Sequence, residues 1–261
     1  MKITVVKVGG AVVEDPLSLE ELLGEFCSLP GAKVLVHGGG RTATKVASSL
    51  GITTEMIEGR RVTSAQMLEV VTMVYGGLVA KKIVSSLAKK GMKAISLTGA
   101  DMCAVKAHRR PPVEIAGKMV DFGFVGDIDS VDADSLVSLI KEGTVPVMAP
   151  LSFDPKGGTL LNTNADTMAG AVASALAKAG NEVSLVYCFE KKGVLSDPDD
   201  EDSVIKRITP ASFVSLKQEG IVSGGMVPKI QNAVLALESG VKKVLVTSHK
   251  DIPGGTVIER D

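Results

Sequence analysis

Short apolar runs alternate along this chain with longer stretches whose apolar residues recur at helical spacing. Short strands that are apolar on both faces and separated by helices are typical of a parallel sheet, because each crossover covers the sheet with a helix. The pattern therefore predicts an α/β fold, a three-layer αβα sandwich with an open, mainly parallel central sheet. The predicted strands are Ile3–Val8, Lys33–Val36, Ala94–Leu97, Val145–Ala149, Glu182–Val186 and Lys243–Val246. The predicted helices are Ser18–Leu29, Thr42–Leu50, Ala65–Lys90, Ala133–Glu142, Asp166–Ala179, Ala211–Gln218 and Lys229–Ser239.

Two stretches break this alternation, and one predicted helix is unusually long. Val105–Phe124 and Phe153–Leu161 contain turn residues between apolar flanks and are predicted to be β-hairpins. The helix Ala65–Lys90 is apolar on more than one face, so it would suit a homodimer interface, although it would equally suit a core helix of a single chain. Because no linker-like segment interrupts the pattern, we expect one continuous sheet with two lobes, residues 1–180 and 181–261.

Charge and composition argue against several classes of function. The 29 Lys and Arg residues nearly balance the 30 Asp and Glu residues, which gives no electrostatic reason to expect nucleic acid or an anionic membrane as a partner. No stretch approaches the roughly 18 apolar residues of a membrane span, and the N-terminus lacks the pattern of a signal peptide. Cys27, Cys103 and Cys188 are too scattered for a disulfide framework or a zinc site. We therefore expect a cytoplasmic protein.

Two predicted strands end in glycine-rich sequences that could present backbone N–H groups to an anion. Lys7 precedes Gly9 and Gly10 at the end of the first strand, and His37 precedes Gly38–Gly40 at the end of the second. Consecutive glycines bury no side chain, and before a helix their unpaired N–H groups attract phosphate or carboxylate. A glycine pair can also be a plain turn, and a lysine at a strand end can be a solvated charge. The spacing fits neither a P-loop nor a dinucleotide-binding fingerprint, and we expect the histidine to be a hydrogen-bonding group and not a base.

Three further motifs place polar groups next to predicted helix starts. Gly59–Thr63 holds two arginines, whose guanidinium groups are natural partners of a carboxylate unless they are only solvated. Asn162–Asp166 precedes a helix rich in small residues, where Asn164 or Asp166 could also be only an N-cap. Ser223–Lys229 again combines a glycine pair with a lysine. Two lysines beside backbone anion sites, without an arrangement for nucleophilic catalysis, favour in-line phosphoryl transfer, which needs charge neutralisation and no protein nucleophile.

Taken in order, these motifs resemble those of the amino-acid kinase family, most closely its N-acetylglutamate kinase branch. The resemblance covers essentially the whole chain and lies in KVGG, HGGG, GRRVT, NTNAD and GGMVPK. It implies the amino-acid kinase fold, with an N-terminal lobe that binds the acyl-amino-acid and dimerises, and a C-terminal lobe that binds Mg-ATP. It also implies phosphorylation of the γ-carboxylate of N-acetyl-L-glutamate, or of N-succinyl-L-glutamate, to an acyl phosphate early in arginine biosynthesis. A carboxylate is already ionised at pH 7, so this reaction needs no general base.

The resemblance further implies roles for individual residues. Lys7 and Lys229 would stabilise the charge on the transferring phosphoryl group, and Asp166 would hold both lysines in place. Mg²⁺ would be carried by ATP and not by a protein metal site. The phosphate nest would be Gly9, Gly10, Gly39 and Gly40, and the substrate-binding residues Arg61, Asn162 and Asn164. The nucleotide-binding residues would be Glu190, Lys191, Lys192, Gly193, Val194, Leu195, Ile221, Val222, Ser223 and Met226.

Departures from the family pattern leave some alternatives open. Glu190 stands where relatives usually carry an Asp, so the preferred base stays open, and Arg60 adds a charge that would suit an anionic acyl group if it points into the pocket. Because the chain begins at its first strand, we expect a dimer without arginine feedback. A sibling kinase for aspartate, glutamate, uridylate or carbamate is the main alternative, and Arg61 with the NTNAD cluster argues against it. A non-catalytic amino-acid or nucleotide sensor of the same fold would not need both lysines.

Overall fold

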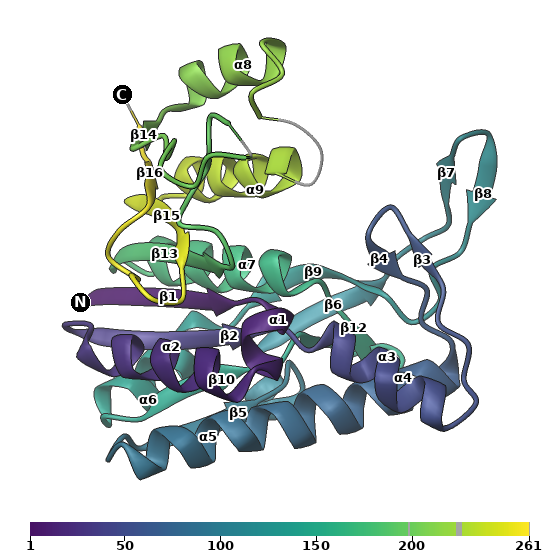
Figure 1. The fold of residues 1–261 in the computed structure, drawn as a ribbon. Helices are drawn as coiled ribbons and strands as arrows, with labels where there is room; N and C mark the ends of the chain where they lie inside the picture. Colours follow the sequence, from purple (N-terminus) through teal and green to yellow (C-terminus); the bar gives the residue numbers. More distant parts are fainter. Residues whose placement is uncertain (198, 223–225, 261) are drawn as a thin grey trace.

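An eight-stranded sheet forms the centre of the computed structural model, which describes residues 1–197, 199–222 and 226–260 (Figure 1). The strand order is β14-β16-β15-β13-β1-β2-β10-β5, and every pairing is parallel except that of β15 with β16. All the predicted strands are therefore confirmed as members of one mainly parallel sheet. Their bounds are β1 (Lys2–Val8), β2 (Ala32–His37), β5 (Ala94–Leu97), β10 (Val145–Met148), β13 (Glu182–Phe189) and β15 (Lys243–Ser248), and the added strands are β14 (Arg207–Ile208) and β16 (Thr256–Ile258).

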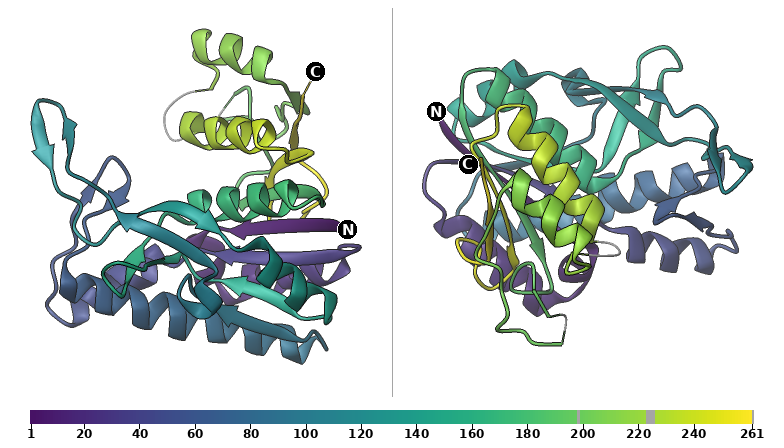
Figure 2. Two further views of the ribbon diagram at one scale, coloured as in Figure 1. Left: turned by 180° about the vertical axis from the view of Figure 1, so that it is seen from behind. Right: turned by 90° about the horizontal axis from the view of Figure 1, so that it is seen from above.

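Helices cover both faces of this sheet, which confirms the three-layer sandwich (Figures 1 and 2). Side chains of β1 alternate between the two cores: Ile3 and Val5 join the cluster that includes α7, and Val6 and Val8 join the cluster that includes α2. Within the described ranges no helix is long and apolar enough to cross a membrane. One face of the sheet is covered by α1 (Gly10–Glu14), α2 (Pro16–Ser28), α3 (Gly40–Ser49) and the helical run 65–89. The other face is covered by α6 (Ala133–Lys141), α7 (Ala165–Lys178) and α9 (Met226–Glu238). The helix α8 (Pro210–Gln218) packs on α9.

The long helical run departs from the prediction of one α-helix over Ala65–Lys90. It consists of α4 (Ala65–Val71), the π-helix η1 (Thr72–Val79) and α5 (Ala80–Lys89). A π-helix rotates the following residues relative to an α-helix, and here it keeps Tyr75 and Val79 buried against the strand end of β2. Dimerisation through this run stays a prediction, as does the division into lobes at residue 180.

One predicted hairpin is confirmed, and the other contains a hairpin smaller than the predicted stretch. Phe153–Leu161 forms the antiparallel pair of β11 (Leu151–Asp154) and β12 (Thr159–Asn162). In Val105–Phe124, however, β6 pairs with β9, which lies beyond the predicted segment, because Pro111 and Pro112 cannot continue the ladder of hydrogen bonds. The remaining elements are β3 (Met56–Ile57) with β4 (Arg60–Arg61), the 3₁₀ turn η2 (Asp101–Cys103), β6 (Val105–Arg109), the small hairpin β7 (Val113–Ile115) with β8 (Lys118–Val120), and β9 (Gly126–Val131).

Candidate active site

The N-terminal and C-terminal halves of the central sheet meet at β1. Its neighbours are β2 on one side and β13 on the other, and all three strands run parallel. Their carboxyl ends, Val8, His37 and Phe189, therefore lie at one edge of the sheet. In open α/β sheets ligands bind outside the carboxyl ends of the strands, at the point where the strand order reverses. The loops that follow two neighbouring strands go to opposite faces of the sheet there and leave a crevice between them.

The three predicted catalytic residues converge at this edge. Lys7, near the end of β1 and only 7% exposed, places its Nζ 2.7 Å from Oδ1 of Asp166 in the first turn of α7. The Nζ of Lys229, on α9, lies 3.9 Å from the centre of the Phe189 ring, and the Nζ of Lys7 lies 5.1 Å from the same ring. Burial lowers the pKa of Lys229; the Asp166 carboxylate opposes this shift and the charge of Lys7 adds to it. Two cations and one carboxylate thus share a partly buried site.

The predicted nest glycines are neighbours in space. Gly9 is the N-cap of α1, which Gly10 opens, and Gly40 opens α3. A Cβ added to Gly10 would lie 3.5 Å from the backbone N of Gly39 and 3.6 Å from that of Gly40. A Cβ added to Gly38 would lie 3.0 Å from the backbone N of Gly10, closer than ordinary contact. The close approach of the two loops therefore requires glycine at position 38. The N–H groups of Gly9 and Gly38 already donate to the carbonyl oxygens of Cys188 and Val8, at 3.3 and 2.9 Å, so the candidates for binding an anion are Gly10, Gly39 and Gly40.

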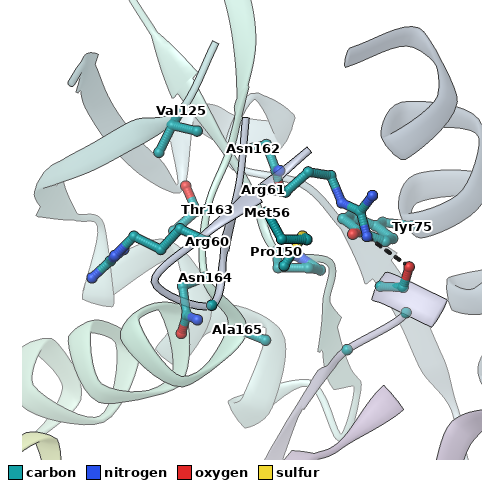
Figure 3. A pocket seen from close by; sticks show the side chains of 14 residues that line it. Met56, Arg60, Arg61, Tyr75, Val125, Pro150, Asn162, Thr163, Asn164 and Ala165 are labelled. Atoms are coloured by element: carbon teal, nitrogen blue, oxygen red, sulfur yellow. Dashed lines mark hydrogen bonds between the residues drawn. The ribbon is translucent and has the colours of Figure 1, made fainter. Parts of the chain in front are cut away.

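A cavity of about 180 Å³ opens beside this nest (Figure 3). All three predicted substrate residues, Arg61, Asn162 and Asn164, line it. Its walls come from the start of α3, the β3–β4 hairpin, the π-helix and the segment that leads into α7. The complete lining is Gly38, Gly39, Gly40, Met56, Gly59, Arg60, Arg61, Tyr75, Val125, Pro150, Asn162, Thr163, Asn164 and Ala165.

Arg61 is a buried cation held by hydrogen bonds from one of its nitrogens. The side chain donates from Nη2 to the carbonyl oxygen of Gly40 at 2.8 Å and to Oγ1 of Thr44 at 2.9 Å. Its Nη1 is also buried but has no hydrogen-bond partner among the described residues. A buried N–H group without an acceptor is unfavourable, and a carboxylate is the acceptor that a guanidinium binds best. Arg61 also lines the cavity beside Tyr75, so this wall carries a positive group of the kind that binds a carboxylate.

Arg60 lies along the same cavity and extends in the opposite direction from Arg61 (Figure 3). It is half-buried, and burial lowers its pKa; the neighbouring charge of Arg110 acts in the same direction, whereas Asp127 opposes it. The Arg110 guanidinium is already paired with Asp127. The guanidinium of Arg60 is therefore the available positive group at this end of the cavity.

The two predicted asparagines have different local roles. Asn162, at the end of β12, is buried and donates from Nδ2 to Oγ1 of Thr63 at 2.9 Å. Asn164 is the N-cap of α7, because its Oδ1 accepts the backbone N–H of Asp166 at 2.8 Å and of Thr167 at 3.1 Å. The capping interpretation is thus confirmed for Asn164, which also lines the cavity.

The predicted nucleotide segment after β13 is part exposed and part buried. Glu190 is exposed and lies 3.7 Å from Arg41, measured between Oε1 and Nη2, and Lys192 pairs with Asp202 at 2.9 Å. Both Glu190 and Lys192 line a second cavity of about 640 Å³. Lys191 is exposed and Leu195 half-buried, whereas Gly193 and Val194 are buried.

Buried parts of the predicted nucleotide segments serve the fold. The backbone N–H of Val194 donates to Oγ1 of Thr256 at 2.8 Å, so this group is already paired. Val222 belongs to the core, Met226 packs against it, and Ile221 is half-buried. Ser223, with Gly224 and Gly225 of the GGMVPK motif, lies outside the described residues.

Comparison with known proteins decides the family. Residues 2–248 match the family model described as "Amino acid kinase family". The chain belongs to this family. It is 52% identical over 261 residues to acetylglutamate kinase of Phocaeicola vulgatus, covering 99% of each chain. It is 54% identical over 246 residues to acetylglutamate kinase of Bacteroides thetaiotaomicron, covering 94% of this chain and 93% of that one. Among solved structures, smu.665 from Streptococcus mutans superposes with a TM-score of 0.80 at 26% identity, covering 99% of both chains.

Two residues that the motifs did not indicate also lie at the site of this amino acid kinase family member. Phe189 lies beneath both lysines, and Tyr75 packs on the nest, where a Cβ added to Gly39 would lie 3.0 Å from its Cδ1. Phe189 is the last residue of β13, so its position at the carboxyl end of a central strand is a usable sequence signal. Tyr75 offers only its place beside a glycine pair inside a helical pattern.

The charges of the site define what it can do. Among the described residues no group of three or more His, Cys, Asp or Glu side chains is arranged to hold a metal ion. Cationic side chains gather instead: Lys7 and Lys229 at the strand edge, and Arg61 in the cavity. An amino acid kinase with this arrangement can neutralise a phosphoryl group and a carboxylate placed next to each other.

Proposed function

We propose that this amino acid kinase transfers the γ-phosphoryl group of Mg-ATP to the γ-carboxylate of N-acetyl-L-glutamate, a step of arginine biosynthesis. The proposal rests on one arrangement: the Lys7–Asp166 pair lies at the strand edge, beside a cavity that the buried cation Arg61 lines. Relatives named acetylglutamate kinase, which this chain matches over nearly their full length, support the same reaction.

The chemistry needs charge stabilisation and no proton transfer from the protein. An oxygen of the γ-carboxylate attacks the γ-phosphorus of ATP, and the bond between that phosphorus and the oxygen bridging to the β-phosphorus breaks. ADP leaves with that electron pair, and the products are ADP and an acyl phosphate. Because the carboxylate is ionised at pH 7, no base removes a proton. Lys7, Lys229 and the N–H groups of Gly10, Gly39 and Gly40 would stabilise the charge on the phosphoryl group, while Mg²⁺ enters on the phosphates of ATP.

The cavity would hold the amino-acid part of the substrate. The guanidinium of Arg61 would bind the α-carboxylate, and Asn162 and Asn164 would contact the acylamino part. This orientation directs the γ-carboxylate toward the nest. The nucleotide would lie along residues 190–195 and 221–223 and near Met226, next to the second cavity.

Steady-state kinetics test this assignment. We expect ADP release with Mg-ATP and N-acetyl-L-glutamate, but not with free L-glutamate or L-aspartate. Arg61→Ala should raise the KM for the acylated substrate about 10- to 100-fold, the value of a lost charged hydrogen bond. Thr44→Val is the control, because it removes one partner of Arg61 but leaves the guanidinium in the cavity. An unaltered KM in Arg61→Ala would contradict the carboxylate site.

The two lysines are tested by turnover. Lys7→Ala and Lys229→Ala should each raise the barrier by roughly 2 to 4 kcal/mol, which lowers kcat about 30- to 1000-fold with little change in nucleotide affinity. Lys242→Ala is a matched control, because Lys242 pairs with Glu182 at the opposite, amino-terminal edge of the sheet. Unchanged kcat in either active-site variant would remove its assignment.

Arg60 favours a second candidate substrate, an N-acylated glutamate whose acyl group is itself anionic, such as N-succinyl-L-glutamate. The half-buried guanidinium lines the cavity away from Arg61 and would pair with a second carboxylate. If this is correct, Arg60→Gln should lower kcat/KM for the succinyl substrate about tenfold while that for the acetyl substrate changes little. An equal effect on both substrates would contradict a role of Arg60 in acyl recognition.

A further inference from the structure

His37 is a completely buried polar side chain at the edge of the proposed phosphoryl site. It is the last residue of β2, it is 0% exposed, and Gly38 follows it directly. Its Nδ1 lies 2.8 Å from the carbonyl oxygen of Gly38. A carbonyl oxygen can only accept a hydrogen bond, so Nδ1 carries the proton and donates it. Burial lowers the pKa of the imidazole to about 4, so the ring is neutral near pH 7.

The ring has no position from which to act as a base toward the substrate. Its Nε2 is buried and makes no hydrogen bond with the described residues. Its neighbours in the lining, Gly38, Gly39 and Gly40, face the cavity, whereas His37 does not line it. Within the part of the chain that the structure describes, the one hydrogen bond of the imidazole is therefore the bond to the backbone of the nest.

That bond controls a peptide unit of the nest. The Gly38 carbonyl and the Gly39 N–H belong to the same peptide, which is planar, so the direction of the carbonyl fixes the direction of the N–H. On its other side the Gly38 N–H donates to the carbonyl oxygen of Val8 at 2.9 Å. Gly38 is thus held by β1 at its N–H and by His37 at its carbonyl oxygen.

The peptide that His37 holds lies next to the first glycine loop. The backbone N of Gly39 would be 3.5 Å from a Cβ on Gly10, and the Tyr75 ring closes the opposite side of Gly39. Without the bond from Nδ1, this peptide could rotate, because glycine on both sides gives little resistance to changes of backbone angle. A rotated peptide would present a carbonyl oxygen, which repels phosphate, in place of an N–H.

We propose that His37 is a positioning residue: its Nδ1–H fixes the Gly38 carbonyl so that the Gly39 N–H stays directed at the transferring phosphoryl group. The role of the Gly39 N–H rests on the proposed function. The orientation of the peptide in the free protein does not depend on it.

Two variants separate the hydrogen bond from the volume of the side chain. His37→Asn places an amide N–H₂ group on Cγ, where Nδ1 stands in histidine, whereas His37→Leu fills the space without a donor. We expect His37→Leu to lower kcat at least about tenfold with KM for both substrates changed less than about threefold, and His37→Asn to restore most of kcat. The Gly39 amide resonance of the ¹⁵N-labelled protein without ligands should shift strongly in His37→Leu and little in His37→Asn. Circular dichroism of each variant identifies any loss of fold.

The outcomes distinguish this inference from the proposed function. Wild-type protein without turnover on any acylated glutamate would overturn the proposed function, while the Gly39 resonance would still test the role of His37. With wild-type turnover present, a His37→Leu variant with normal kcat would overturn the inference. Equal losses in folded His37→Leu and His37→Asn, with the Gly39 resonance unmoved in both, would also overturn it.

Discussion

Replacing Asp166 by asparagine tests whether charge pairing holds the site together. The side chain of Lys7 is 8% exposed and that of Asp166 17%. Removing one partner of a buried ion pair costs about 3–5 kcal/mol, because the remaining charge stays buried and unpaired. The partial exposure of Asp166 reduces this cost, and the nearby charge of Lys229 adds repulsion toward Lys7. We therefore expect Asp166→Asn to lower the free energy of unfolding by about 3 kcal/mol, which for a chain of this length lowers Tm by about 6–12 °C.

A double-mutant cycle assigns this loss to the Lys7–Asp166 pair. Lys7→Met removes the buried cation together with its need for a partner, so we expect the double variant Lys7→Met/Asp166→Asn to be more stable than Asp166→Asn alone. Urea unfolding followed by circular dichroism gives the free energies for the cycle. Asp129→Asn is the matched control, because its exposed pair with His108 should contribute no more than about 1 kcal/mol.

Two results would refute this reasoning. One is a loss in Asp166→Asn that is no larger than in Asp129→Asn. The other is a double variant whose loss equals the sum of the single losses, which would mean that Lys7 and Asp166 contribute independently.

Two further predictions concern Lys229 and Gly39. Because burial lowers the pKa of Lys229, its protonated form destabilises the folded chain at neutral pH. Lys229→Met should therefore lower kcat as much as Lys229→Ala does and yet raise the free energy of unfolding. At pH values between the lowered pKa of Lys229 in the folded chain and the unfolded value of about 10.4, the unfolded chain binds more protons than the folded chain. The free energy of unfolding of the wild type should therefore rise relative to that of Lys229→Met as pH increases through this range. A difference in free energy that does not depend on pH would contradict this. Gly39→Ala places a Cβ 3.0 Å from the Tyr75 ring and should lower kcat/KM about tenfold, whereas Gly77→Ala meets nothing within 4 Å and should leave it unchanged. An unchanged kcat/KM in Gly39→Ala would contradict the need for glycine at this position of the nest.

The sequence was sufficient to predict six of the eight strands of the central sheet and most of the helices around it, but not β14, β16 or α1. Strands such as β10 are continuous apolar runs, because both of their faces are covered. The β3–β4 hairpin was missed, since it is short and lacks an apolar alternation. Within Val105–Phe124, predicted to be one hairpin, only the short β7–β8 pair forms one. The π-helix was also missed. Its apolar residues recur at a spacing that an ordinary buried α-helix would also show, so the sequence does not indicate the wider turn.

The site was only partly predictable for a related reason. The motifs place Lys7 and Asp166 at a strand end and a helix start, which the parallel topology brings to one edge. The bond from Arg61 to Gly40 joins residues that are 21 positions apart and depends on how the β3–β4 hairpin folds over α3. Such side-chain contacts follow from packing and leave no periodic trace in the sequence.

The central claim is best tested by trapping the acyl phosphate. The purified protein would be incubated with Mg-ATP, N-acetyl-L-glutamate and hydroxylamine, and the hydroxamate and ADP would be measured together. We predict equal amounts of hydroxamate and ADP in the wild type, and a loss of both of at least about 30-fold in Lys7→Ala. ADP release without hydroxamate, or hydroxamate formation unchanged in Lys7→Ala, would contradict phosphoryl transfer to the carboxylate by this site.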